Sequence, residues 1–356
     1  MQPRMTHSVT SEAYELLKQL ISTPSLSREE AGAADILCHF LEQHNVAFHR
    51  ELNNVWALSQ NYEDQKPTLL LNAHIDTVKP AAGWEHDPFT PCEEGDLIYG
   101  LGSNDDGASV VCLLQTFRNL SREDLPYNLI FLASAEEEIS GRNGVEHMLP
   151  LLPPITAALV GEPTGMRPAI AEKGLMVLDV IMHGKAGHAA RGEGENAIYK
   201  ILKDLEWLRT HRFSRISPLL GEVRMTVTGI NGGTQHNVTP DRCTLLVDVR
   251  PNECYTNREI FDEIVQNLQS EVQAHSFRLN PSGISTTHPL AAAAIALCGE
   301  PFGSPTLSDQ ALMPFPSLKM GPGESSRSHT ADEFIKKSEM ADAIDKYEKL
   351  LKELKL

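Results

Sequence analysis

Three short apolar runs in the first half of the chain contain almost no polar residue, which is typical of strands that are covered on both faces. Between the first two runs, residues 107–119 carry apolar residues at helical spacing, with Val110, Leu114 and Phe117 on one face. A strand, a helix and a strand at this spacing predict a parallel or mixed sheet with helices on both sides. The three apolar runs are 67–75, 128–135 and 155–160.

Helical periodicity also marks both ends of the chain, where it predicts four further helices. The second of them opens with the segment Ser27 to Glu30, whose spacing is typical of a capping box. A stretch rich in Gly and Pro, 301–323, separates the last two. The four helices are expected at 10–20, 29–44, 289–298 and 331–354.

The middle of the chain follows a different pattern, in which strands and amphipathic helices come in the order β-α-β-β-α-β. This order is the ferredoxin-like signature. We therefore expect an α/β fold in which a ferredoxin-like domain, 171–283, is inserted into a sheet domain formed by 1–170 and 284–356. The expected elements of the insert are a strand at 175–184, a helix at 195–212, strands at 221–230 and 242–250, a helix at 257–274 and an edge strand at 276–280.

The composition fits a soluble enzyme: 41% of the 356 residues are hydrophobic and 22% are charged, enough for a sizeable core. No apolar run approaches the roughly 18 residues of a transmembrane helix, and the first residues lack the apolar core of a signal peptide. We therefore expect a cytoplasmic protein without a membrane partner. The net charge of -17 argues against a nucleic-acid partner. The six cysteines show no C-x-x-C spacing and are expected to be thiols in a reducing compartment.

Acidic residues and histidines follow several of the apolar runs. In open α/β sheets, residues just beyond the strand ends converge on one crevice. A histidine near each end of the set, with carboxylates between them, is a ligand set suited to a pair of zinc-like ions. The sequence therefore predicts a metal-dependent hydrolase. The candidate residues are His74, Asp76, Asp105, Glu136, Glu137, Glu138, Glu162 and His329.

In two of these motifs, neighbouring residues are expected to have different roles. His74 and Asp76 stand two positions apart in an extended segment, so their side chains point to the same side. His74 would bind metal through one ring nitrogen, and Asp76 would accept from the other. A histidine near an ordinary acidic residue is an equal alternative for this pair alone. In the segment G-L-G-S-N-D-D-G, Asp106 is expected to cap the following helix, whereas Asp105 would be redundant as a cap and would face the crevice.

The three glutamates at 136–138 directly follow an apolar strand. Three adjacent carboxylates repel one another unless something stabilises them. One of them would hold an ion, and its neighbour would take a proton from metal-bound water, whose pKa the ion lowers. A solvated acidic turn is the alternative.

These separated motifs resemble the M20 family of metallopeptidases and deacylases, which includes acetylornithine deacetylase, succinyl-diaminopimelate desuccinylase and glutamate carboxypeptidase. The resemblance runs over nearly the whole chain. It implies two zinc ions, with cobalt as a further possibility, and Asp105 as the ligand that bridges them. His74 and Glu162 would share one ion, and Glu138 and His329 would share the other.

The resemblance also implies roles for residues that do not bind metal. Glu137 would be the general acid/base, Asp76 would orient its neighbouring histidine, and the inserted domain would be a lid that also forms a homodimer. His188, in G-K-A-G-H-A-A-R-G, would reach the active site of the partner subunit and stabilise the oxyanion. Asn237 and Arg250 stand at positions that bind substrate in the family, and a surface ion pair is the alternative for Arg250.

The implied reaction is hydrolysis of the amide bond of an N-acyl amino acid by a metal-bridging hydroxide, as in acetylornithine deacetylase of arginine biosynthesis. The alternatives are a desuccinylase, a small-peptide carboxypeptidase or a catalytically silent metal-binding homologue. The chain departs from the family pattern at Leu101, where the family usually has Arg, and at Asp106-Gly107, where a Lys-Gly pair is frequent. Both departures concern the contacts around Asp105 and therefore the subgroup.

Overall fold

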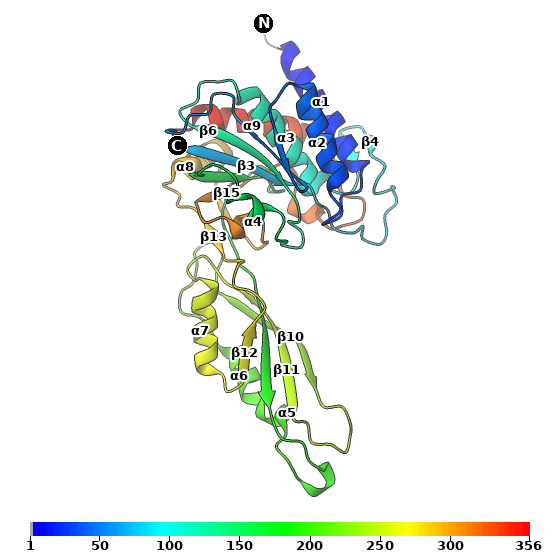
Figure 1. The fold of residues 1–356 in the computed structure, drawn as a ribbon, viewed down its shortest axis with the longest axis vertical. Helices are drawn as coiled ribbons and strands as arrows, with labels where there is room; N and C mark the ends of the chain where they lie inside the picture. The colour runs from blue at the N-terminus through cyan, green and yellow to red at the C-terminus, as the bar shows by residue number, and fades with distance from the viewer. Residues whose placement is uncertain (1–2) are drawn as a thin grey trace. The chain divides into compact units, whose positions relative to one another are not determined.

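The computed structural model describes residues 3–356, and their side chains from Thr10 onward. The chain divides into two compact units (Figure 1). Each unit has a hydrophobic core of its own. The predicted α/β fold class is confirmed, because the first unit is built on a mixed sheet covered by helices. Every helix within the described residues is too short or too polar to traverse a bilayer. The first unit comprises the chain up to Ile170, Gly283–Phe302 and Ser308–Leu356, and the second comprises Ala171–Ser282 and Gly303–Leu307.

The central strands of the first unit run in parallel. β3 (Thr68–His74) pairs with β6 (Asn128–Ser134) on one side and with β7 (Ala157–Val160) on the other. β15 (Ser317–Lys319) continues the parallel arrangement beside β7, and β2 (Asn54–Leu58) lies antiparallel to β6. All three predicted apolar strands are therefore confirmed, and their carboxyl ends share one edge of the sheet. The other strands of this sheet are β1 (His49–Glu51), β8 (Ala169–Glu172), β13 (Ser282–Gly283) and β14 (Phe302–Ser304).

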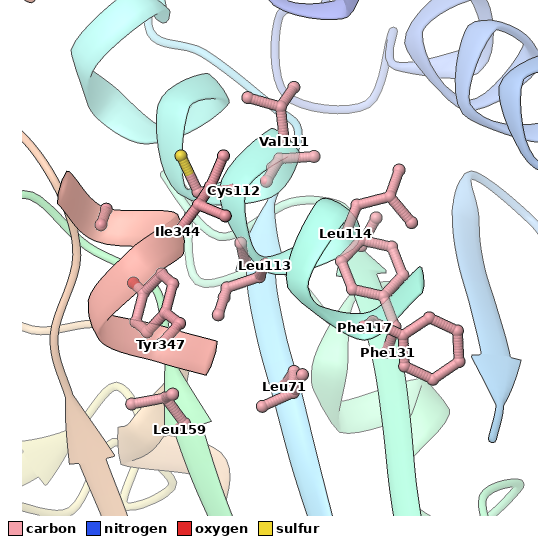
Figure 2. Packing of buried hydrophobic residues seen from close by; sticks show 14 of the residues in the cluster. Leu71, Val111, Cys112, Leu113, Leu114, Phe117, Phe131, Leu159, Ile344 and Tyr347 are labelled. Carbon is pink, nitrogen blue, oxygen red and sulfur yellow. The ribbon is translucent and has the colours of Figure 1, made fainter. Parts of the chain in front are cut away.

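The central strands lack polar residues because each face of the sheet is covered. Leu69 and Leu71 belong to the larger core, whereas Leu70 between them belongs to a second core on the opposite face. Figure 2 shows Leu71 and Phe131 of the sheet packed against side chains of helix α3. The helices of the larger core are α1 (Pro3–Ile21), α2 (Ala31–Gln43), α3 (Ala108–Leu120), α8 (Pro289–Cys298) and α9 (Lys337–Glu353), and the second core contains α4 (Val145–Met148).

Two helix starts in the first unit differ from the prediction. The predicted capping box is wrong: α2 begins at Ala31 without a side-chain cap, and the Ser27 hydroxyl instead donates to Asp76. The predicted cap at Asp106 is also wrong, because no side chain caps α3. Both expectations rested on local spacing. In the structure, Ser27 binds a residue 49 positions away, and the Asp106 side chain is buried.

The closing helix also begins later than expected. Residues Phe334–Lys336 form strand β16, which pairs with β5 (Leu97–Tyr99), and β5 pairs in turn with β4 (Cys92–Glu94). This small three-stranded sheet holds the segment before α9 in an extended conformation. It also connects two parts of the chain that are more than 200 residues apart.

The second unit has the element order β-α-β-β-α-β, with its helical part between the first two strands divided into two short helices. Its four strands are antiparallel and lie in the order β10-β11-β9-β12, the ferredoxin-like arrangement. The Thr256 side chain and Glu259 form a capping box at the start of α7. The elements are β9 (Met176–His183), α5 (Ala197–Lys200), α6 (Leu202–Thr210), β10 (Arg224–Gly232), β11 (Arg242–Arg250), α7 (Asn257–Asn267) and β12 (Glu271–Ala274).

The expected helix at 257–274 begins where predicted but ends earlier, and the expected edge strand at 276–280 is wrong. Helix α7 ends at Asn267, and the last strand is Glu271–Ala274, which pairs with β9. The buried carboxylate of Asp204 accepts hydrogen bonds from the backbone N–H groups of Gln269 and Ser270. These contacts hold the turn that ends the helix.

Candidate metal centre

The candidate residues of the first unit gather at the edge where the parallel strands end. His74 is the last residue of β3, Glu137 and Glu138 follow β6, and Glu162 follows β7. Asp105 comes from the turn Ser103–Gly107 that leads into α3. His329 follows a short 3₁₀ helix, Ser325–Arg327. Because parallel strands end at the same edge, short extensions beyond them converge, as the sequence predicted.

The five predicted ligands form two groups that share one residue. His74, Asp105 and Glu162 offer ligand atoms within 4.8 Å of one another, and so do Asp105, Glu138 and His329. Asp105 faces the two groups with different oxygens: Oδ1 lies 3.1 Å from Nε2 of His74, and Oδ2 lies 3.6 Å from Nε2 of His329. The ring of His329 also contacts Glu138 at 3.0 Å. A carboxylate in this position is suited to bridge two ions.

The cluster carries an excess of buried negative charge. Burial raises the pKa of Glu137 and of Glu162 well above the ordinary value, and neighbouring carboxylates raise each of them further. Burial also raises the pKa of Asp106 to about 8, and the nearby carboxylate of Asp105 raises it further. Imidazole nitrogens and carboxylate oxygens are ligands of zinc-like ions. The donor set and its charge therefore fit a pair of divalent cations.

Asp76 holds both the histidine and the glutamates in place. Nδ1 of His74 lies 2.9 Å from the backbone oxygen of Asp76 and 3.4 Å from its carboxylate, which leaves Nε2 to face Asp105. The Asp76 carboxylate accepts the backbone N–H groups of Glu137 at 2.9 Å and Glu138 at 3.1 Å. It also accepts the Ser27 hydroxyl at 2.7 Å. Asp76 thus fixes the orientation of the ligands on two strands, which is more than the sequence predicted.

The three consecutive glutamates have three different environments. Glu138 belongs to the second donor group, and Glu137 belongs to neither, although its carboxylate lies 3.9 Å from Nε2 of His74. Glu136 points elsewhere: its carboxylate accepts the side-chain amide of Asn143 at 2.7 Å. Of the three, only Glu137 is both next to the donor groups and outside them.

Several residues that shape the site carried no signal in the sequence. Glu333 is buried and accepts the backbone N–H groups of Gly102, Asn104 and Asp105, so it holds the turn that presents Asp105. Burial raises the pKa of Glu333 to about 8, against the effect of these hydrogen bonds. The sequence around Glu333 does not reveal this role, because its partners are 228 to 231 residues away.

Three further buried charged residues lie close to the ligands or to the segments that carry them. Asp309 accepts the hydroxyl of Ser134 at 2.6 Å, and burial raises the pKa of Asp309 to about 6. Lys319, on β15, is buried, and its charge lowers the pKa of Glu162 against the larger effect of burial. Glu30 is buried as well and accepts the backbone N–H of Glu136 at 3.2 Å. Each of them could be recognised only from the fold.

The other predicted site residues lie in the second unit. His188 and Asn237 are neighbours, because the segments that contain them pair at His188 and Val238 and the Asn237 backbone oxygen accepts the N–H of Ala189. Arg250 ends β11 and binds the carboxylate of Asp248 with two nitrogens. Nine residues of β11, roughly 25 Å of strand, separate Arg250 from the end of the sheet that carries His188.

Metal content tests the shared ligand. Asp105→Asn is expected to remove both ions of this centre, because Asp105 belongs to both donor groups. His329→Ala, which alters one group only, is expected to remove one. The measurement is elemental analysis after dialysis against zinc at a concentration that saturates the unaltered protein, with Glu136→Gln as the control that keeps both ions. Loss of a single ion from Asp105→Asn would contradict a bridging role.

Comparison with known proteins finds metal-dependent hydrolases of similar sequence and fold. An acetylornithine deacetylase of Proteus mirabilis (strain HI4320) is 29% identical, and the alignment covers 90% of this chain and 91% of that enzyme. A succinyl-diaminopimelate desuccinylase of Wigglesworthia glossinidia brevipalpis is 28% identical, with 72% of each chain covered.

The fold has a solved counterpart in the YXEP protein of Bacillus subtilis, described as a dinuclear metal binding peptidase from the M20 family. It is 17% identical, with a TM-score of 0.73, and the match covers 97% of this chain and 98% of that one. Residues 70–353 match peptidase family M20/M25/M40, which confirms the resemblance inferred from the motifs: the chain belongs to this family of metal-dependent hydrolases.

Proposed function

We propose that the protein is a dinuclear deacylase that hydrolyses the amide bond of an N-acyl amino acid, in the manner of acetylornithine deacetylase in arginine biosynthesis. The observation that carries the proposal is the pair of donor groups that share Asp105 and leave Glu137 beside them. Zinc is the proposed metal, with cobalt as the alternative, because imidazole and carboxylate ligands suit both. The six free cysteines fit a reducing compartment, and we infer a cytoplasmic location.

In the proposed reaction, different residues transfer the proton and hold the reacting groups in position. When bound, the ions polarise the amide carbonyl and lower the pKa of the attacking water. Glu137 takes the proton from that water and delivers it to the leaving nitrogen. Asp76 keeps His74 and the backbone of Glu137 in position throughout, through the hydrogen bonds it shares with each. The products are a carboxylate and a free amine.

A homodimer formed through the second unit is part of the proposal. Strand β10 lies at the edge of its sheet, and large apolar side chains are exposed on and near it, including Ile230 at 59% and Tyr199 at 73%. Exposed apolar patches of this kind mark interaction surfaces. The length of β11 adds a second argument: His188 and Arg250 of one chain are too far apart to contact the same small substrate. If both bind it, they come from different chains.

Turnover of defined substrates tests the proposal. The zinc-loaded protein is incubated with N-acetyl and N-succinyl derivatives of ornithine, citrulline and diaminopimelate, and release of the free amine is measured. We expect hydrolysis of an N-acetyl amino acid above the level seen with Glu137→Gln. Preference for N-succinyl substrates would instead identify a desuccinylase. Cleavage of short peptides alone would identify a carboxypeptidase, and metal binding without any turnover a silent homologue.

A further inference from the structure

A second kind of metal-ligating cluster lies on the small three-stranded sheet, outside the proposed metal centre. His86, Cys92 and Glu94 offer a ring nitrogen, a thiol sulfur and a carboxylate oxygen within 4.8 Å of one another. None of these residues belongs to the two donor groups around Asp105, and the proposed reaction uses none of them. The three side chains are partly or largely exposed, so an ion could reach them from solvent.

The strands place two of the three side chains on one face. Cys92 and Glu94 are two positions apart on β4, so they point the same way, and Glu93 between them points to the other face. Glu93 there binds Lys18 and Lys337. The lysines therefore neutralise the carboxylate on the opposite face and leave Glu94 to face the histidine, whose Nε2 lies 3.7 Å from it.

The third ligand is held in place by its surroundings. Tyr99 lies directly opposite Cys92 in the sheet, and its ring stacks on that of His86 at 4.3 Å with an interplanar angle of 11°. Nδ1 of His86 lies 3.0 Å from Oδ1 of Asp332. The Asp332 carboxylate is fixed in turn by the backbone N–H groups of Glu85 and His86.

This arrangement is typical of a metal site in which a supporting carboxylate orients the histidine ligand. Histidines that bind metal generally donate their other ring N–H to a carboxylate, which sets the tautomer and the ring orientation. With Nδ1–H directed at Asp332, the free nitrogen of His86 is Nε2, on the side of Glu94. A set that includes an imidazole nitrogen and a thiolate suits zinc and related transition metals, whereas magnesium and calcium prefer sites made of oxygen ligands alone.

We infer that His86, Cys92 and Glu94 form a third metal site, which binds a zinc-like divalent ion with three protein ligands and leaves further positions to solvent. Asp332, which orients His86, stands between His329 and Glu333, which belong to the metal centre. Asp332 therefore links the proposed third site to the segment that carries His329. The inference does not depend on which amide the enzyme hydrolyses.

Cobalt absorption tests the inference, because none of the five ligands proposed for the metal centre is a cysteine. Cobalt(II) bound to a thiolate gives a charge-transfer band in the near ultraviolet, so this band reports only a site that contains Cys92 or another thiol. The full-length protein is stripped of metal and titrated with cobalt while absorption and bound cobalt are followed. We expect the band in the unaltered protein and one bound cobalt fewer in Cys92→Ser, which lacks the band.

Matched variants separate this site from other thiols and from misfolding. Cys38→Ser removes another partly buried thiol and is expected to keep the band. Asp332→Asn keeps all three ligands and is expected to weaken cobalt binding about 10- to 100-fold, as loss of such a supporting carboxylate typically does. Absence of the band at saturating cobalt, or its persistence in Cys92→Ser, would overturn the inference. Either result leaves the proposed deacylase unaffected, since amide hydrolysis is measured separately.

Discussion

Replacing Glu137 with Gln is expected to lower kcat about 10²- to 10⁴-fold, the usual contribution of general acid/base catalysis. Glutamine has nearly the same shape but cannot accept the proton of the attacking water. Since Glu137 belongs to neither donor group, the metal content of the variant is expected to stay unchanged. The measurements are steady-state kinetics on the preferred N-acyl amino acid and elemental analysis of the same preparation.

Glu136→Gln is the matched control for this prediction. It removes the same charge one position earlier, but its side chain faces Asn143 and not the donor groups. We expect Glu136→Gln to retain most of the activity. Near-normal turnover by Glu137→Gln, with intact metal content, would mean that another group takes the proton and would remove the central element of the proposed mechanism.

His188→Ala is expected to lower kcat about 10²- to 10³-fold, the typical effect of losing one oxyanion donor. An imidazole N–H at the developing oxyanion acts mainly in the transition state, so KM should change much less than kcat. Metal content and the stability of the first unit should be unaffected, because His188 belongs to the second unit. The check is a full kinetic comparison of the variant with the unaltered protein.

Mixed dimers determine whether His188 acts on the partner's site. Subunits with His188→Ala are mixed with Glu137→Gln subunits, and subunit exchange is verified by mass. If His188 acts across the dimer, each mixed dimer contains one site with both groups intact, and activity rises well above that of either variant. If exchange occurs and activity does not recover, His188 acts within its own chain or not at all.

The fold was predictable wherever burial alone sets the pattern. β3 and β6 read as bare apolar runs because both faces of the sheet are covered, and α8 was placed at its observed bounds. Prediction failed where a distant residue decides the local structure. Helix α7 ends at Asn267, and the backbone N–H groups just beyond it donate to Asp204 on another helix, a contact that no local pattern reveals.

The same distinction applies to the site. Four of the five candidate ligands could be proposed because they end or follow a strand or lie in the turn before a helix, where the fold class brings side chains together. His329 instead follows a short 3₁₀ helix. Ser27 was assigned to a helix cap because its spacing fits one, although its hydroxyl binds Asp76. Glu333 and Asp309 could not be found, because a buried carboxylate that supports a ligand is indistinguishable in sequence from one on the surface.

The hydrogen bonds from the Asp105 turn to Glu333 also have a consequence for when, during synthesis of the chain, the proposed metal centre can form. During synthesis, the strands that carry His74, Glu138 and Glu162 leave the ribosome well before Glu333 does. Until Glu333 has been synthesised, the backbone N–H groups of the Asp105 turn lack the carboxylate to which they donate in the folded protein. His329 has not been synthesised at this stage either. We therefore expect a nascent chain that ends before residue 329 to lack the complete ligand set, so metal loading follows translation rather than guiding it.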